Sequence, residues 1–420
     1  LAPAWQTART ALTTELNDSS RGSSGGFHRR KLRAVLVVGE MALSLVLLVG
    51  AGLLIRSFDR LLSQPLGFVP EQVISVTFGL PDKKYGDSNG EKPRFFSQLL
   101  EKARALPGVD SAAVVYGVPL GGQMSSLSVD IPGAPPPGPG EAVSAGYSQI
   151  SPDYFRTLNI PVLQGRDFTE QDRFDTTPVL IVNEAFVRNL KLGKDVIGRR
   201  IGVGDGTQNA EIVGVVRDIK RFNITEAAQG EMYRPYRQRC WGYMSLVMRT
   251  KREPGELMRA LRAEVDTLDK DLPFESPRTL TRLVASSVAQ RRLSVQLLGG
   301  FAGVALILAA IGLYGVLAYN VAQRKREIGI RLALGARHTD VMQLVLRQGM
   351  TLALVGVAIG AAGAFGLSRF LGSLLFEIKP SDPATFAIVT AVLVVTAFFA
   401  CWIPARRASR VDPMVALRND

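Results

Sequence analysis

The sequence predicts a membrane protein with four transmembrane α-helices and a large α+β domain between the first and second of them. Four apolar runs are long enough to cross a bilayer, and the long segment that separates the first two alternates strand-like and helix-like patterns. The chain combines 47% hydrophobic residues with 21% charged residues, so it must have both membrane-embedded and water-exposed parts.

The first apolar run, 34–55, would reach roughly 33 Å as a helix, which is enough for the hydrocarbon core of a bilayer. The other three predicted spans are 295–321, 349–371 and 384–403. The second span has Gly299 and Gly303 four positions apart, and the third has Gly356 and Gly360 at the same spacing. Small residues at this spacing let helix backbones approach closely, so we expect them to serve helix packing.

The distribution of Lys and Arg predicts which segments stay in the cytoplasm. Segments 1–33, 322–348 and 404–420 together hold 16 Lys and Arg against 6 Asp and Glu. Segment 56–294 is nearly balanced, at 32 against 28. Because basic residues beside spans resist translocation, we expect the three basic segments on the cytoplasmic side of a bacterial plasma membrane. Segment 56–294 and the short loop 372–383 are expected on the outer side. The formal net charge of +13 is therefore explained by topology, and no motif indicates nucleic-acid binding.

The segment 56–294 interleaves strands with helices, which predicts α+β layers, in the form of two βαβ lobes with an inserted subdomain. We interpret the glycine-rich Gly202–Gly206 as a hairpin turn. The basic run Tyr233–Arg239 could hold an acidic ligand, but an exposed strand edge is the favoured interpretation.

The segment Gln323–Arg347, between the second and third predicted spans, is the strongest candidate for a functional site. Its apolar residues recur at helical spacing, and its basic residues fall largely between them, which predicts an amphipathic helix. Such a helix could set topology by charge alone, lie on anionic lipid, or dock a soluble partner. The apolar residues are Ile328, Leu332, Leu334, Val341, Leu344 and Val345.

No catalytic or metal site is predicted. The sequence contains no G-x-x-x-x-G-K-[ST], G-x-S-x-G or H-E-x-x-H motif, and its two histidines, His28 and His338, are far apart. Cys240 and Cys401 are expected not to pair, because one lies in the outer segment and the other within the last span. Glu40 is the only charge within the first span; we expect it to meet water or a neighbouring arginine, a role in function being the alternative.

The order Arg326-Glu327-Ile328-Gly329-Ile330-Arg331-Leu332-Ala333-Leu334-Gly335-Ala336 resembles the cytoplasmic loop of MacB/FtsX-type ABC transporter permeases. Four further stretches are similar to this family in the same order: Gly39–Phe58 to its first helix, and Ser151–Asp172, Val182–Phe186 and Glu211–Asp218 to its periplasmic core domain. The branch with the greatest similarity is that of the duplicated orphan permeases. The resemblance implies a MacB-type periplasmic core with an insertion near 151–210.

The resemblance implies a permease that couples a separate cytoplasmic ATPase to the outer domain, for export or mechanotransmission. ATP would be bound by that partner, so this chain would be no enzyme and would hold no cofactor. A second permease half and the lipid bilayer would be its other partners. The residues implied in ATPase coupling are Arg324, Arg326, Glu327, Ile328, Gly329, Arg331, Leu332, Gly335 and Ala336. The alternative is a membrane-anchored sensor or scaffold whose outer domain binds a ligand without ATP-driven work.

A weak repeat links the two ends of the chain. Pro3-Ala4, Arg9 and Leu16 match Pro404-Ala405, Arg410 and Leu417 at a constant offset, and residue 1 is leucine, not methionine. We therefore expect segment 1–33 to be a linker from a preceding, related permease half.

Overall fold

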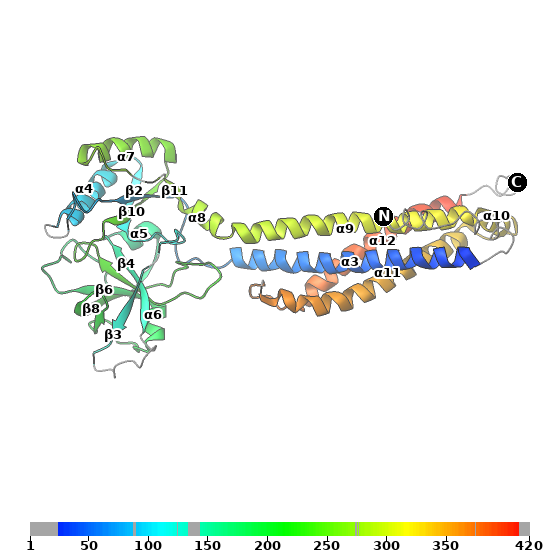
Figure 1. Cartoon of the computed structure of the whole chain (residues 1–420), viewed down its shortest axis with the longest axis horizontal. Helices are drawn as coiled ribbons and strands as arrows, with labels where there is room; N and C mark the ends of the chain where they lie inside the picture. Colours follow the sequence, from blue (N-terminus) through cyan, green and yellow to red (C-terminus); the bar gives the residue numbers. More distant parts are fainter. Residues whose placement is uncertain are drawn as a thin grey trace, which may run out of the picture. The chain divides into compact units, whose positions relative to one another are not determined.

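The computed structural model describes residues 24–86, 90–123, 125–132, 143–273, 275, 277–373 and 375–410. The repeat between the two ends therefore lies largely outside the described residues. The chain divides into two compact units: a helical unit formed by residues 1–62 and 291–420, and an outer unit formed by residues 63–290. Figure 1 shows the long helices of the first unit and the strands of the second.

Four helices of the helical unit are long and apolar enough to cross a membrane. They are α3 (Ser24–Leu62), α9 (Ala289–Gln323), α11 (His338–Ser368) and α12 (Pro383–Ser409), and a short 3₁₀ turn, η1 (Phe370–Ser373), follows α11. The helices extend beyond the apolar runs because the polar residues at their ends still form backbone hydrogen bonds of helical type. In particular, α3 begins at Ser24, within the segment expected to be a linker.

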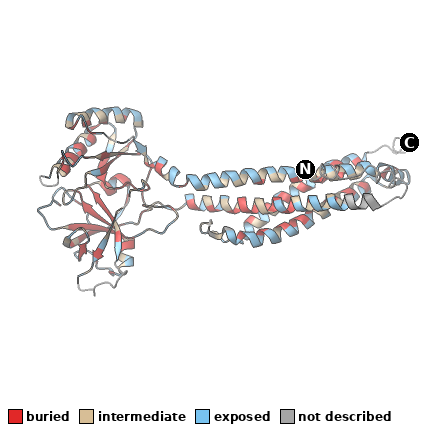
Figure 2. Cartoon of the chain, in the orientation of Figure 1, coloured by how far each residue is buried: buried red, intermediate tan, exposed pale blue. Residues whose placement is uncertain are grey.

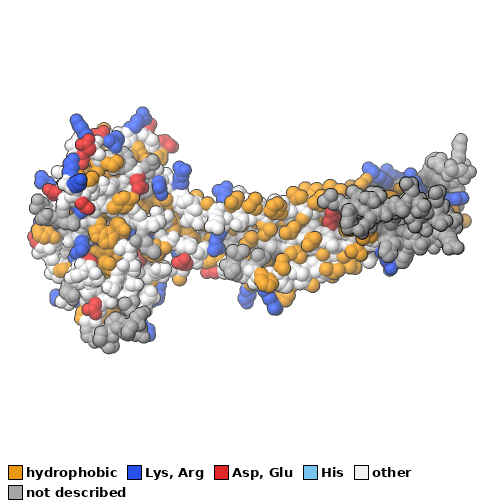
Figure 3. Space-filling view, viewed as in Figure 1, with side chains coloured by type: hydrophobic (Ala, Val, Ile, Leu, Met, Phe, Trp, Pro, Cys, Tyr) orange, Lys and Arg blue, Asp and Glu red, His pale blue; other side chains and the backbone are white. Residues whose placement is uncertain are grey.

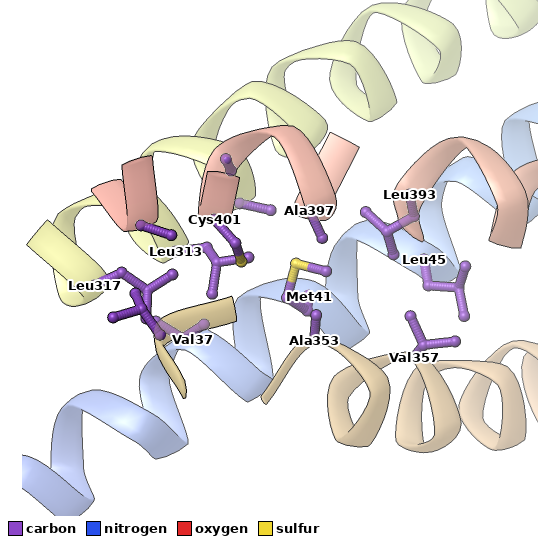
Figure 4. Close-up of a cluster of buried hydrophobic side chains, with 14 of the residues drawn as sticks. Val37, Met41, Leu45, Leu313, Leu317, Ala353, Val357, Leu393, Ala397 and Cys401 are labelled. Carbon is purple, nitrogen blue, oxygen red and sulfur yellow. The ribbon is translucent and has the colours of Figure 1, made fainter. Parts of the chain in front are cut away.

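The buried faces of all four helices meet in one hydrophobic cluster (Figure 4). Met41 and Leu45 of α3, Leu313 of α9 and Leu393 of α12 are almost completely buried in it. Elsewhere the long helices present hydrophobic side chains outward, as Figure 3 shows, where a lipid-facing surface is expected.

Small residues of α11 bring its backbone against α3. A Cβ atom added at Gly360 would lie 2.8 Å from the carbonyl oxygen of Ala42, and one added at Gly356 would lie 2.6 Å from the Cβ of Met41. The predicted packing role of this pair is therefore confirmed. The corresponding pair of α9 differs, since nothing lies within 4 Å of a Cβ added at Gly299 or Gly303.

The outer unit contains two lobes that share one sheet (Figure 1). In the first lobe, strands lie in the order β11-β1-β10-β2, with β1 and β2 both antiparallel to β10. Helices α4 and α7 cover one face of these strands, and Phe96 of α4 and Leu261 of α7 share a core with alternate strand residues, including Phe78 and Leu246. The bounds are β1 (Val73–Gly79), α4 (Glu91–Ala105), β2 (Val109–Val115), β10 (Tyr243–Thr250), α7 (Pro254–Leu268), β11 (Arg278–Thr279) and α8 (Leu280–Ser287).

The second lobe is formed by the chain between β2 and β10, and so interrupts the first. Its strands close into a ring, because β9 pairs with β6 on one side and with β4 on the other, while β4, β3, β7, β8 and β6 pair in sequence. The bounds are β3 (Ser126–Asp130), β4 (Ser144–Ile150), α5 (Tyr154–Leu158), β5 (Val162–Gly165), β6 (Val179–Asn183), α6 (Glu184–Asn189), β7 (Arg200–Val203), β8 (Thr207–Val216) and β9 (Glu231–Pro235).

This arrangement changes two sequence-based expectations. The second lobe is more than a βαβ unit, because its strands close into a ring that includes the parallel pair β6 and β8, and the inserted chain runs from β3 to β9, well beyond 151–210. The α+β class itself is confirmed, as is the hairpin turn at Gly202–Gly206, which joins β7 to β8. Figure 2 shows buried residues concentrated in the strands of both lobes.

A buried arginine joins the two lobes. Arg221 donates hydrogen bonds to the carbonyl oxygens of Tyr116 and Gly117, both just beyond β2, and to Ser148 Oγ in β4, at 2.8–2.9 Å. Its charge is balanced by the buried carboxylate of Glu231, 3.6 Å away. A buried pair of this kind costs desolvation energy, and its hydrogen bonds to fixed carbonyl groups hold the lobes in register.

The α3–α11 contact is tested by two matched glycine substitutions. Gly360→Leu should destabilise the helical unit by about 1–3 kcal/mol, because the added side chain meets the backbone of α3. Gly366→Leu, on the same helix with nothing within 4 Å, should be neutral. Thermal unfolding of the purified protein in detergent measures both, and equal effects of the two substitutions would contradict the contact.

Candidate functional site

The basic segment between the second and third spans forms two helices. Helix α10 (Lys325–Ala333) is short, and α11 begins at His338, so the single helix predicted over Gln323–Arg347 is wrong. The break lies at Gly335, which has a φ of +93°. Glycine adopts this left-handed conformation without steric cost and is the usual residue just beyond a helix end. The sequence therefore ends α10 at the point where it can turn back toward α11.

The break divides the apolar residues of the segment between two environments. Ile328 is only 4% exposed and belongs to the hydrophobic cluster of the helical unit, together with Val341 and Val345 of α11. Gly329 is buried beside it, and Leu332 packs at the edge of the cluster. These residues attach α10 firmly to the spans.

Leu334 and Leu344 do not share that buried face, contrary to the amphipathic-helix prediction. The exposed fraction is 82% for Leu334, 43% for Ile330 and 43% for Leu344. Arg326, Ile330 and Leu334 are four positions apart, and all three are exposed, so they form a stripe along α10 that combines one cation with two apolar side chains. We call Arg326, Ile330 and Leu334 the α10 stripe. Contiguous exposed apolar side chains mark places where a protein contacts a partner or a membrane.

Glu327 organises the cations beside the stripe. Its carboxylate lies 2.6 Å from Arg331 Nη2 and 3.8 Å from Arg324 Nε, one helical turn away on either side. Both pairs are exposed and contribute little to stability. They bring Arg324 and Arg331 close to one carboxylate next to the α10 stripe.

Hydrogen bonds hold the turn between α10 and α11 in place. The backbone nitrogen of Ala336 donates to the carbonyl oxygen of Arg331 at 3.0 Å, and that of Arg337 donates to Asp340 Oδ2 at 3.1 Å. His338 Nδ1 is hydrogen-bonded to the carbonyl oxygen of Ser409 at the end of α12. These bonds tie the α10–α11 turn to the last helix.

Glu40 of α3 faces α9. Its carboxylate would lie 2.2 Å from a Cβ added at Gly312, so a larger residue there would require the Glu40 side chain to move. The hydroxyl of Ser44, one turn along α3, donates to the carbonyl oxygen of Ala305 in α9 at 3.0 Å. In the described part of the chain no arginine or lysine lies within ion-pair distance of Glu40, so the expected arginine partner is absent there. The polar residues of α3 serve contact with α9.

The outer unit holds a cavity of about 1010 Å³ that the sequence did not reveal. Tyr116 and Trp241 form one part of its lining, with their ring centroids 4.3 Å apart, and Arg237 and Arg239 form another. Burial lowers the pKa of Arg237, but a hydrogen bond to Tyr236 and the charge of Glu170 raise it. The net result is a pKa above the ordinary value for arginine. Arg237 is therefore a permanent cation in the cavity wall.

The pairing of β9 on both sides overturns the expectation of an exposed strand edge at Tyr233–Arg239. Strand β9 lies between β4 and β6, Tyr233 is completely buried, and Arg234 is paired with Asp205 at 2.5 Å. The spacing of Arg237, Arg239 and Trp241, three alternate residues just beyond β9, is a sequence signal that could have indicated the cavity. Cys240 and Cys401 form no disulfide with each other, as expected, and Cys401 is buried in the helical unit.

Comparison with known families gives matches over most of the chain. Residues 34–268 match the family model described as MacB-like periplasmic core domain, and residues 299–413 match the one described as FtsX-like permease C-terminal.

The individual relatives share less than 30% sequence identity with this chain. A protein of Chromobacterium violaceum named macrolide export ATP-binding/permease protein MacB is 29% identical over 66% of this chain and 44% of its own length. One of the same name, MacB 1, from Yersinia pseudotuberculosis is 26% identical over 100% of this chain and 62% of its own length. The chain thus spans about half the length of the curated relatives it matches.

Among solved structures, the periplasmic region of MacB from Actinobacillus actinomycetemcomitans covers 54% of this chain and 97% of its own, with 14% identity and a TM-score of 0.37. A domain of a permease protein from Porphyromonas gingivalis covers 50% of this chain and 92% of its own, with 16% identity and a TM-score of 0.32.

The role of Gly335 is tested by substitution within the turn. Gly335→Val should strain the turn by about 1–2 kcal/mol, because a β-branched residue resists a φ of +93°. The end of α10 should then open more often, which hydrogen exchange of its amides measures. Gly335→Asn should have a smaller effect, since asparagine tolerates this conformation better. Unchanged exchange in the valine variant would mean that the turn does not depend on this backbone conformation.

Proposed function

Because the chain belongs to the MacB/FtsX-type permease family, we propose that it is the permease part of an ABC transporter, in which a separate cytoplasmic ATPase docks on α10. It is a multi-pass membrane protein with four candidate spans. No phosphate-binding loop of the type G-x-x-x-x-G-K-[ST] occurs in its sequence, so in this proposal a partner binds and hydrolyses the ATP.

The observation that carries the proposal is the α10 stripe. It exposes two apolar side chains and a cation on a helix whose opposite face is fixed in the cluster of the spans by Ile328. A segment that only set topology would need charge and no exposed leucine. A partner that covers Ile330 and Leu334 would therefore gain apolar contact and push on a helix that moves together with α9 and α11.

We propose mechanotransmission as the outcome. The outer unit is joined to the helical unit by the end of α3 and the start of α9, which are the two places where the chain passes between them. A displacement of α10 would reach the outer unit along those helices. Export of a substrate gathered by the outer domain is compatible with this scheme, and a second permease half would complete the transporter.

The cavity of the outer unit favours a second candidate function. A site lined by Tyr116, Trp241 and two arginines has the composition of a pocket for an aromatic or anionic ligand. A sensor or scaffold would bind such a ligand there without ATP-driven work. The two candidates differ in whether an ATPase occupies the α10 stripe.

The orientation in the membrane is tested by cysteine labelling. In a background of Cys240→Ser and Cys401→Ala, single cysteines replace Phe174, Phe370 and Leu334, whose exposed fractions are 82–83% in the free chain. An impermeant maleimide should label the first two positions in intact cells and the third only after permeabilisation. Labelling of the Leu334→Cys variant in intact cells would contradict the proposed orientation.

Docking is tested by a charge placed within the stripe. Leu334→Glu should weaken co-purification of the ATPase by about thirtyfold or more, because it puts a carboxylate into a desolvated apolar contact. Thr339→Glu adds the same charge at an exposed position in the first turn of α11 and should retain the partner. Membrane insertion of both variants is the control.

Glu327→Lys provides a second, independent variant. It breaks the pairs with Arg324 and Arg331, but it adds positive charge and so should leave the orientation unchanged. Loss of the partner with normal insertion supports docking. Full retention in both Glu327→Lys and Leu334→Glu would favour the sensor or scaffold.

A further inference from the structure

A second cavity lies in the helical unit, beside α10 but separate from its exposed stripe. It has a volume of about 490 Å³ and is bounded by residues of α3, α9 and α11. Its polar lining consists of Arg33, Asn320, Arg347, Gln348 and Thr351, and its apolar lining of Ala34, Val316, Leu344 and Leu352.

The charge of this cavity is unbalanced. Two arginines and no carboxylate are among its lining residues. Within the described residues no carboxylate lies within ion-pair distance of either guanidinium, whereas the nearby Arg324 and Arg331 share Glu327. The Arg33 guanidinium is held in position over the ring of Tyr319, 4.0 Å from its centroid. Two uncompensated cations that line one cavity attract an anion.

The position of the cavity specifies the kind of anion. Arg33 directly precedes the apolar run of α3, and Arg347 lies two residues before the apolar part of α11. The arginines are therefore at the end of the spans, where phosphate headgroups of a bilayer lie, and the apolar lining belongs to the spans themselves. Arg347 and Thr351 are exposed, so the cavity opens on the surface of the helical unit. An amphiphile with an anionic head fits both parts of the lining.

We propose that this cavity binds the headgroup of an anionic phospholipid, such as phosphatidylglycerol. Arg33 and Arg347 pair with the phosphate, the amide groups of Asn320 and Gln348 donate to its oxygen atoms or to the glycerol, and the acyl chains lie along Val316 and Leu352. The site holds α3, α9 and α11 together by means of a lipid. It does not depend on the identity of any ATPase.

The site has a consequence for α10. Asn320, Leu344 and Gln348 also line a small hollow next to it, whose other residues include Arg324, Glu327 and Arg331. A headgroup in the cavity therefore lies beside the cations that pair with Glu327. Anionic lipid in the cavity therefore stabilises the parts of α9 and α11 that lie beside α10.

The test uses the full chain in mixed micelles with phosphatidylcholine, to which phosphatidylglycerol is added. Phosphatidylglycerol should raise the melting temperature in a saturable manner, and native mass spectrometry should show it retained in preference to phosphatidylcholine. The half-saturating fraction should rise by about fivefold in Arg33→Gln or Arg347→Gln, and by about thirtyfold in the double variant. Arg410→Gln, which removes an exposed charge outside the cavity, should have no such effect.

One further variant and one further ligand separate the possible outcomes. Thr351→Trp keeps both arginines and fills the cavity, so it should abolish the response even if the arginine variants fold poorly. Glycerol phosphate alone should not reproduce the stabilisation, because it lacks acyl chains. The proposal is overturned if phosphatidylcholine is retained equally, if Arg410→Gln weakens the response as much as the cavity variants, if Thr351→Trp retains the response, or if glycerol phosphate replaces the lipid.

Discussion

The close backbone contact between α3 and α11 is the constraint on which the helical unit depends. In a bilayer, hydrophobic burial does not drive helices together, so they associate where small side chains allow close van der Waals contact. Gly356 and Gly360 provide that contact, and Met41 and Leu45 of α3 continue it into the shared cluster. Ile328 enters the same cluster, so the position of α10 follows from the packing of the spans. A short basic helix in water would otherwise have little reason to stay folded.

The outer unit obeys a different constraint, namely that every strand edge must be paired or covered in water. The second lobe meets it by closing its strands into a ring, and the first lobe by ending on β11, an edge strand of only two residues. Arg221 is buried with Glu231 between the two lobes. It fixes the junction of the lobes through hydrogen bonds to backbone carbonyl groups. The cavity lined by Trp241 opens next to this junction, since Tyr116 contributes both to its lining and to the bonds of Arg221.

Much of this could be predicted from the sequence, because lipid imposes simple patterns. The apolar runs predicted the four spans, and the spacing of Gly356 and Gly360 predicted the face of α11 that packs closely against α3. The break at Gly335 was missed because the apolar period continues across it, although a glycine after Leu334 is itself a helix-end signal. Tyr233–Arg239 was misplaced for another reason: whether β9 lies at an edge depends on the parallel pairing with β4, which is remote in sequence and leaves no local pattern.

The central claim is that the α10 stripe is the docking surface for an ATPase, and a photo-crosslinking amino acid at Leu334 tests it most directly. The matched control position is Phe370, which is equally exposed and follows the other end of α11. After irradiation of intact cells, mass spectrometry should identify an ABC-type ATPase attached at position 334 and none at position 370. Attachment only to lipid, or to a protein without a nucleotide-binding domain, at position 334 would contradict the account.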